Sequence, residues 1–217
     1  MIAAAEPGRI LILNGAPRSG KSTLVALVRE RLPGRWINLG VDMHMERMLP
    51  PELLPGIGLR PGGERPDLEA HIPALYGALY ESIAAHSRAG FDVVVDIAHH
   101  DAYSRPLGIL PDCARRLAGL PVLFVGLRCA LPAIMKRRGA SDPARGYLTA
   151  GADQPVPPPV LRWQEAVHAH GHYDLELDTG LLPPEACLAA IAEALAHPPE
   201  HPTAFERLAA GKCRPET

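Results

Sequence analysis

The stretch from Gly15 to Ser22 has the residue types and spacing of a loop that holds the phosphates of a nucleotide. It reads Gly-Ala-Pro-Arg-Ser-Gly-Lys-Ser and fits the pattern G-x-x-x-x-G-K-[ST]. The two glycines let successive backbone N–H groups turn toward phosphate oxygens, and the helix N-terminus that follows adds partial positive charge. We therefore predict that the phosphates of a nucleotide are bound by residues Gly15, Ala16, Pro17, Arg18, Ser19, Gly20, Lys21, Ser22 and Thr23.

Two side chains of this loop have distinct predicted roles. Lys21 is expected to reach the β- and γ-phosphates, and Ser22 to supply an oxygen ligand to Mg²⁺, which favours oxygen donors. For Arg18, the alternative to nucleotide binding is a side chain that faces solvent. A chance match in a glycine-rich turn is the competing interpretation of the whole loop. An apolar run precedes the loop and a helical pattern follows it, which is the context that the motif requires.

Asp42 follows the second predicted strand and has two interpretations. As a structural residue it would cap the helix after it. As a catalytic residue it would accept the proton of a substrate hydroxyl while that oxygen attacks the γ-phosphoryl group. Ligands of open parallel sheets lie beyond the carboxyl ends of the strands, so either role is compatible with the position.

Asp96 ends the apolar segment "VVVD" and is predicted to hold Mg²⁺ together with Ser22. The alternative is a cap of a helix or turn, because four apolar residues before an acid are common. His99 and His100 are adjacent, so they would point in different directions. We interpret them as loop residues near a substrate rather than as metal ligands.

A set of basic residues follows the fourth predicted strand: Arg128, Lys136, Arg137, Arg138 and Arg145. A phosphotransferase needs positive charge over the transferring group and a segment that excludes water. We favour Arg137 and Arg145 for that role. A solvated basic helix face is the alternative, and it suits Lys136 and Arg138.

The elements that must position these residues alternate along the chain. Apolar segments typical of strands cover residues 10–13, 36–41, 91–95, 121–127 and 173–177. Helical spacing covers residues 22–31, 43–49, 68–89, 107–117, 131–138, 160–170 and 184–196. Alternating strands and helices, together with the phosphate loop, predict an α/β fold of the P-loop NTPase/kinase type, with a parallel sheet of about five strands flanked by helices on both faces.

We expect a single domain over residues 1–197. Within it, residues 50–67 are rich in Pro and Gly and are predicted to be an exposed excursion. Residues 136–159 are expected to form a lid. The polar segment 198–217 is predicted to be a loosely packed tail.

Composition limits the classes of partner. The formal net charge of the 217 residues is -2, which gives no reason to expect nucleic acid or a membrane surface as partner. No apolar run approaches the roughly 20 residues of a membrane span, and no signal peptide is recognised. The four cysteines form no C-x-x-C pair, so reduced thiols and a cytoplasmic location are expected. The sequence does not indicate an oligomeric state.

Several ordered segments resemble the chloramphenicol 3-O-phosphotransferase family of small P-loop kinases. They are "ILNGAPRSGKS", "GVDMHMERM", "DVVVDIAHH", "VLFVGLRC" and "AVHAHGHYDLELDT", and together they span most of the chain. The phosphate loop is shared by many proteins, whereas the second and last segments are more specific.

The resemblance implies an ATP-dependent kinase that phosphorylates a hydroxyl of a small molecule. At the matching position, Asp42 is the implied base. The arginines implied in phosphate handling are Arg128, which we assign to nucleotide binding, and Arg137 and Arg145, which we assign to the lid. Asp178 is interpreted as structural or near the nucleotide base.

The resemblance does not identify the acceptor substrate. Residues 50–67 give no match where the family builds its acceptor pocket, and the lid differs in the spacing of its arginines. We therefore expect either a chloramphenicol-like antibiotic or another alcohol as substrate. The alternatives are a regulatory or toxin-like nucleotide-binding module and a metabolic kinase of the shikimate or gluconate type.

Overall fold

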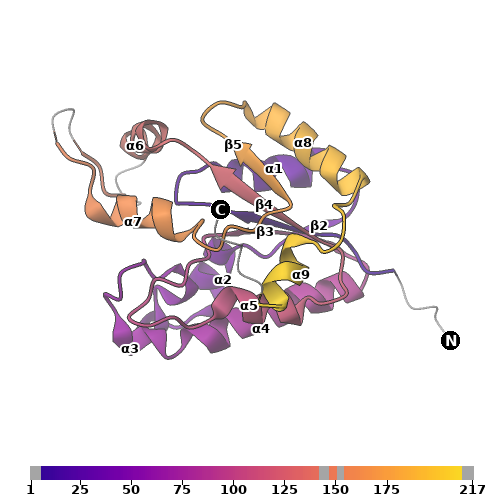
Figure 1. Ribbon diagram of the computed structural model, residues 1–217, viewed down its shortest axis with the longest axis horizontal. Helices are drawn as coiled ribbons and strands as arrows, with labels where there is room; N and C mark the ends of the chain where they lie inside the picture. The colour runs from indigo at the N-terminus through magenta and orange to yellow at the C-terminus, as the bar shows by residue number, and fades with distance from the viewer. Residues whose placement is uncertain (1–5, 142–146, 151–153, 212–217) are drawn as a thin grey trace.

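Five short segments pair into one parallel sheet at the centre of the molecule (Figure 1). The computed structural model describes residues 6–141, 147–150 and 154–211. The strands are β1 (Ile10–Asn14), β2 (Trp36–Asn38), β3 (Asp92–Ile97), β4 (Val122–Arg128) and β5 (Leu175–Asp178), in the spatial order β2-β3-β1-β4-β5. Every pairing is parallel. The predicted fold class is confirmed.

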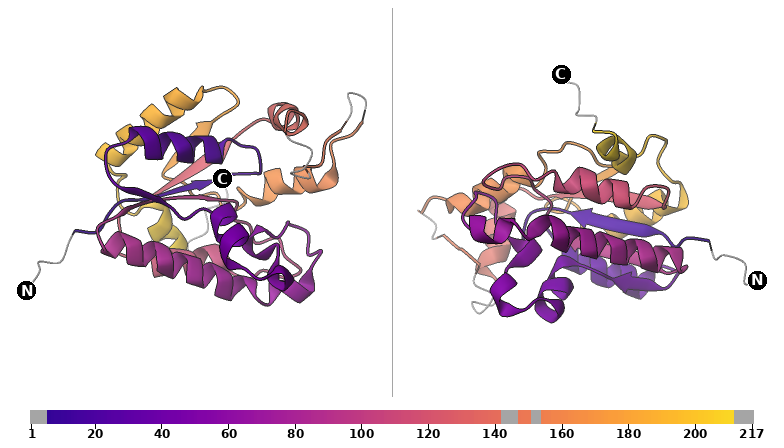
Figure 2. Two further views of the ribbon diagram at one scale, coloured as in Figure 1. Left: turned by 180° about the vertical axis from the view of Figure 1, so that it is seen from behind. Right: turned by 90° about the horizontal axis from the view of Figure 1, so that it is seen from below.

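Helices cover both faces of this sheet, as the two views in Figure 2 show. One face carries α1 (Lys21–Arg31) and α8 (Pro184–Ala196), which contact each other, and the other carries α4 (Ile72–Arg88), α5 (Ile109–Arg116) and α9 (Ala204–Ala209). The remaining elements are α2 (Val41–Met48), η1 (Pro51–Leu53), η2 (Gly56–Gly58), α3 (Pro66–Glu69), α6 (Leu131–Gly139) and α7 (Pro158–Ala166). Both α6 and α7 lie beyond the carboxyl end of β4 (Figure 1).

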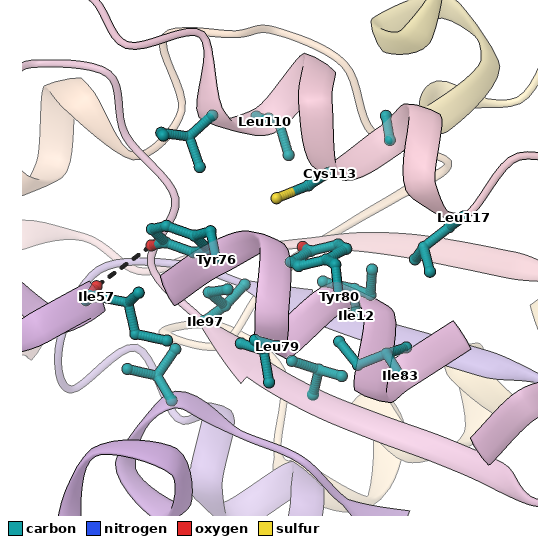
Figure 3. Close-up of a cluster of buried hydrophobic side chains, with 14 of the residues drawn as sticks. Ile12, Ile57, Tyr76, Leu79, Tyr80, Ile83, Ile97, Leu110, Cys113 and Leu117 are labelled. Atoms are coloured by element: carbon teal, nitrogen blue, oxygen red, sulfur yellow. Dashed lines mark hydrogen bonds between the residues drawn. The ribbon is translucent and has the colours of Figure 1, made fainter. Parts of the chain in front are cut away.

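The larger core lies between β1, β3 and the helices α4 and α5 (Figure 3). Tyr76, Leu79, Tyr80 and Ile83 follow the i, i+3, i+4, i+7 spacing of one helix face, and all four are at most 1% exposed. Burial of each such apolar side chain stabilises the fold by roughly 1.5–3 kcal/mol. This packing fixes the sheet whose strand ends carry the site.

The segment predicted to be an exposed excursion is in part buried. Residues 50–67 contain η1, η2 and the start of α3, and Ile57 and Leu59 are only 3% and 4% exposed. Tyr76 donates a hydrogen bond to the Ile57 carbonyl at 3.3 Å (Figure 3). The His100 Nε2 lies 2.9 Å from the Leu59 carbonyl. Apolar burial and hydrogen bonds to α4 and to the loop after β3 therefore hold this segment against the domain.

The expectation of a loosely packed tail from residue 198 is wrong for its first part. Helix α9 buries Phe205 and Leu208 in the larger core. A capping box starts the helix, in which the Thr203 hydroxyl accepts from the Glu206 N–H and the Glu206 carboxylate accepts from the Thr203 N–H. The Asp174 carboxylate also accepts from the Ala204 N–H at 2.7 Å, which ties α9 to the residue before β5.

The structure also bears on membrane spans and on the cysteines. No helix in the described part of the chain is long and apolar enough to cross a membrane. The described cysteines, Cys113, Cys129 and Cys187, are buried and free.

Candidate active site

The phosphate loop joins the buried strand β1 to the N-terminus of α1. Gly20 has φ 96°, a left-handed conformation that favours glycine, and it begins the helix without a side-chain cap. The first backbone N–H groups of α1 therefore face the space in front of the loop. Arg18, Gly20, Lys21, Ser22 and Thr23 line a cavity of about 690 Å³ there.

Lys21 is held at the mouth of the loop by main-chain oxygens. Its ammonium donates to the carbonyls of Gly15 at 2.7 Å and Ala16 at 3.0 Å. Desolvation lowers the pKa of Lys21 to about 8, against the opposing charges of Asp96 and Asp42. A partly desolvated cation of this kind attracts phosphate oxygens strongly.

Ser22 and Asp96 come together although they are far apart in the sequence. The Ser22 hydroxyl donates to Asp96 Oδ2 at 3.0 Å. Burial raises the pKa of Asp96, while Lys21 and the hydrogen bond from Ser22 oppose that shift. A Cβ at Gly40 would lie 1.8 Å from Asp96 Oδ1, so the backbone of residue 40 forms one wall of this carboxylate's position.

The chemistry of this pair fits Mg²⁺. The ion usually takes one or two protein oxygens and completes its shell with water and substrate phosphates. The Ser22 hydroxyl and the Asp96 carboxylate beside the phosphate loop are oxygen donors of this kind. Among the described residues, no group of three or more His, Cys, Asp or Glu side chains could hold a metal ion by itself.

Asp42 lies in the first turn of α2 and lines the same cavity as Lys21 and Ser22. The N-cap of α2 is Gly40, and no side chain caps it. The Gly40 N–H donates to Asn38 Oδ1 at 2.9 Å. The Asp42 side chain is exposed to the cavity rather than used in a cap, so the structural alternative for this residue has no support in the geometry.

Arg137 projects from α6 toward the phosphate loop. Its guanidinium donates to the Arg18 carbonyl at 3.2 Å and to the carbonyl and hydroxyl of Thr179, at 2.5 Å and 3.2 Å. In return, Arg18 donates to the Arg137 carbonyl at 2.9 Å. Both arginines line the cavity, so α6 places Arg137 beside the phosphate loop.

The other basic residues named in the sequence analysis do not line this cavity among the described residues, or lie outside them. Arg128 forms an ion pair with Glu176 at 2.6 Å and is not among the residues that line the cavity. Arg145 lies outside the described residues, as does part of the predicted lid over 136–159. Arg138, interpreted as part of a solvated face, is buried at 6% exposure. It follows Ile134 by one helical turn, so both side chains occupy the inner face of α6.

Sequence reasoning missed Thr179 and Asn14. Thr179 follows β5 and lines the cavity, and its hydroxyl donates to the Ser19 carbonyl at 2.7 Å. Asn14 ends β1, where its side chain accepts from the His99 N–H at 2.8 Å and donates to the Tyr173 hydroxyl at 2.8 Å. Applying the strand-end rule to β1 and β5, as it was applied to β2 and β3, would have found both residues.

The two histidines after β3 are packing residues. His99 is 1% exposed, its Nε2 lies 2.6 Å from the Tyr80 hydroxyl, and burial holds its pKa well below the usual range. His100 packs its ring edge against Trp163. Asp178 accepts from the Gly180 N–H at 2.8 Å and so shapes the turn after β5, which agrees with the structural interpretation.

A parallel sheet in the order β2-β3-β1-β4-β5, with a phosphate loop after β1 and Asp96 as the penultimate residue of β3, is typical of a P-loop phosphotransferase of the kinase type. A model of chloramphenicol phosphotransferase-like proteins matches residues 8–196, and the chain belongs to this family.

Two relatives carry names of this class, and two solved structures share the fold. Two Mycobacterium tuberculosis proteins, from strains CDC 1551 and H37Rv and each named "Putative O-phosphotransferase", are 27% identical over 225 residues, which is 95% of this chain and 90% of each relative. An unliganded sugar kinase from Janibacter sp. HTCC2649 superposes with a TM-score of 0.58 at 20% identity over 89% of this chain and 97% of that chain. The APS kinase of M. tuberculosis gives 0.55 at 17% identity over 88% and 98%.

Proposed function

We propose that the protein is an ATP-dependent kinase that transfers the γ-phosphoryl group to a hydroxyl of a small molecule. The observation that carries this proposal is that Lys21, Ser22 and Asp42 line one cavity in front of the phosphate loop. The solved APS kinase, whose structure is a complex with AMPPNP and APS, has the same fold. The relatives named as O-phosphotransferases support a hydroxyl acceptor.

The residues of the cavity divide the work of such a transfer. Asp42 takes the proton of the acceptor hydroxyl as the new O–P bond forms, and the bond between the γ-phosphorus and the β–γ bridging oxygen breaks to release ADP. Lys21 and Arg137 stabilise the negative charge that spreads over the phosphoryl oxygens. Mg²⁺, held by Ser22 and Asp96, would neutralise charge on the nucleotide phosphates.

The acceptor in this proposal is a chloramphenicol-like antibiotic or another small alcohol, and the protein acts in the cytoplasm, where ATP is available. Neither nucleic acid nor a membrane surface is part of the proposal, because the net charge is only -2.

The test is ADP release in the presence of Mg-ATP and a panel of alcohols, with mass spectrometry to detect phosphorylated products. The panel contains chloramphenicol, shikimate, gluconate and neutral sugars. The Asp42→Asn variant is expected to lose about 10²–10⁴-fold in turnover, since it removes the general base, while AMPPNP still binds. Asp112→Asn is the matched control, because Asp112 pairs with Arg116 on α5. If no alcohol raises ADP release and none gains a phosphoryl group, the kinase proposal fails.

A further inference from the structure

Thr179 is the first residue after β5, and the parallel sheet fixes its backbone. Its N–H donates to the Arg128 carbonyl at 2.9 Å, so the pairing of β4 with β5 extends one residue beyond Asp178. The side chain is buried and forms part of the wall of the phosphate-loop cavity. Strand register therefore decides where this side chain stands relative to the loop.

The Thr179 hydroxyl connects the phosphate loop to α6. It donates to the Ser19 carbonyl at 2.7 Å, and the Arg128 carbonyl is a longer alternative at 3.3 Å. Arg137 donates to the same hydroxyl oxygen through NH1 at 3.2 Å. A hydroxyl has one proton and two lone pairs, so donation to a carbonyl leaves lone pairs for the guanidinium. The carbonyl that takes the proton thus orients the hydroxyl as an acceptor for a cation.

Two further acceptors hold the same guanidinium. Arg137 donates through NH2 to the Thr179 carbonyl at 2.5 Å and through NH1 to the Arg18 carbonyl at 3.2 Å. An unrestrained arginine side chain populates many rotamers, and fixing it costs conformational entropy. Oxygens from the end of β5 and from the phosphate loop therefore select one arrangement of a side chain that comes from a third element, α6.

The three acceptors are neutral, which suits a cation that binds phosphate. Carbonyl and hydroxyl oxygens orient a guanidinium without cancelling its charge, whereas a carboxylate would form an ion pair with it. Arg128 shows the contrast, because it pairs with Glu176 at 2.6 Å and is not among the residues that line the cavity. No ion pair among the described residues includes Arg137.

The hydrogen bonds to these acceptors leave donors for a ligand. A guanidinium has five N–H groups, and the acceptors on Arg18 and Thr179 take three of those of Arg137. Lys21, Ser22 and Arg137 line the same cavity. The remaining donors of Arg137 can therefore serve an anion that is bound in front of the phosphate loop.

We propose that Thr179 is a positioning residue that holds the Arg137 guanidinium in place for the phosphates of the nucleotide. In this proposal Thr179 makes no contact with the phosphates and acts through Arg137. The inference rests on the proposed function for the role of Arg137, but its test measures nucleotide binding and does not require turnover.

The test is a double-mutant cycle in the full-length protein, measured by calorimetric titration of AMPPNP in excess Mg²⁺. Thr179→Val removes the hydroxyl and keeps the shape of the side chain. We expect it to raise the Kd about tenfold or more, because a hydrogen bond to a charged group is lost. In the Arg137→Met background the same substitution should change the Kd by less than about twofold, since the side chain that Thr179 positions is gone.

Two more variants of Thr179 complete the cycle. Thr179→Ser keeps the hydroxyl and should bind AMPPNP more tightly than Thr179→Val. Thr179→Ala removes the hydroxyl without adding a methyl group, so the outcome does not depend on how well valine is accommodated. Thermal unfolding of every variant separates loss of the contact from loss of the fold.

Ser87→Ala is the matched control. Ser87 also has a buried hydroxyl that donates to a main-chain carbonyl, that of Gly8 at 2.6 Å. It lies near the end of α4, and Gly8 precedes β1, so this contact is at the opposite end of the sheet from the phosphate loop. The control should leave the Kd for AMPPNP unchanged in both backgrounds.

Three results would overturn the inference. The first is an equal loss of affinity from Thr179→Val in the wild-type and Arg137→Met backgrounds, which would show that Thr179 acts independently of Arg137. The second is an unchanged Kd in Arg137→Met. The third is a folded Thr179→Val or Thr179→Ala variant that binds AMPPNP as wild type does.

The kinase proposal fails by a different result. Wild-type protein that binds AMPPNP and follows the expected cycle, but phosphorylates no alcohol, contradicts the kinase proposal and supports the positioning role. Binding that does not follow the cycle, together with phosphorylation of an alcohol, contradicts the positioning role alone.

Discussion

Replacing Gly40 with alanine tests whether the backbone before Asp42 fixes the carboxylate of Asp96. The added Cβ would lie 1.8 Å from Asp96 Oδ1 and 3.1 Å from Asn38 Oδ1. Contacts below 3.0 Å are not tolerated, so the Asp96 carboxylate must move by more than an ångström or the start of α2 must shift. Either movement separates Asp96 Oδ2 from the Ser22 hydroxyl, now at 3.0 Å.

The size of the effect follows from what the pair does. A hydrogen bond to a charged group contributes roughly 1.5–3 kcal/mol, which corresponds to about a 10- to 150-fold change in an equilibrium constant. If Ser22 and Asp96 hold Mg²⁺, the loss appears in nucleotide binding only when the metal is present. We therefore expect Gly40→Ala to weaken AMPPNP binding by about that factor in Mg²⁺ and to leave binding in EDTA unchanged.

The assay is calorimetric titration of AMPPNP into wild-type and variant protein, with excess Mg²⁺ or with EDTA. Gly139→Ala is the control, because a Cβ at Gly139 meets nothing within 4 Å. The EDTA titration reports whether the phosphate loop is intact, and circular dichroism reports the fold. Equal affinity of Gly40→Ala and wild type in Mg²⁺, with both folded, would refute the assigned role of this contact.

Two further predictions concern the charge of Lys21 and the packing of α9. Bound phosphate anions raise the pKa of Lys21 above its value of about 8 in the free protein. The affinity for AMPPNP should therefore be fully present below pH 8 and fall as the pH rises through 8. The Lys21→Arg variant stays charged and should remove this decline, so an unchanged decline in that variant would contradict the assignment. Phe205→Ala should lower the free energy of unfolding, measured by urea titration, by about 3–5 kcal/mol because Phe205 is only 4% exposed. The control Glu200→Ala, at an exposed residue, should lower it by less than about 1 kcal/mol. An equally small loss in Phe205→Ala would show that α9 is not part of the core.

Local patterns in the sequence were sufficient for the phosphate loop and the sheet. The spacing from Gly15 to Ser22 depends on backbone conformations that only neighbouring residues decide. Apolar runs between turn residues placed each strand to within a few positions. Because the carboxyl ends of parallel strands lie at one edge, Asp42 and Asp96 could be placed near the loop before their contacts were known.

The C-terminal helix shows where local reasoning was incomplete. Thr203 and Glu206 have the spacing of a capping box, so the helix start was readable from the sequence. The burial of this helix could not be predicted from the sequence, because Phe205 packs on Tyr80 and Phe124, which come from distant parts of the chain. A polar segment rich in proline can thus contain one short helix that completes a core.

The partners of the arginines were decided by tertiary structure alone. Pairing of β4 with β5 places Gly126 opposite Glu176 and Arg128 opposite Asp178, and this register brings Glu176 within reach of Arg128. In α6, consecutive cations look alike in the sequence, yet packing directs Arg137 to the loop and buries Arg138.

The sequence by itself therefore determined that this chain holds phosphates and that carboxylates stand beside them, since both follow from short-range spacing and the common edge of a parallel sheet. Contacts between residues far apart in the chain decide which cations face the cavity and which pair elsewhere. Only the folded structure specifies those contacts, because strand register and helix packing set them.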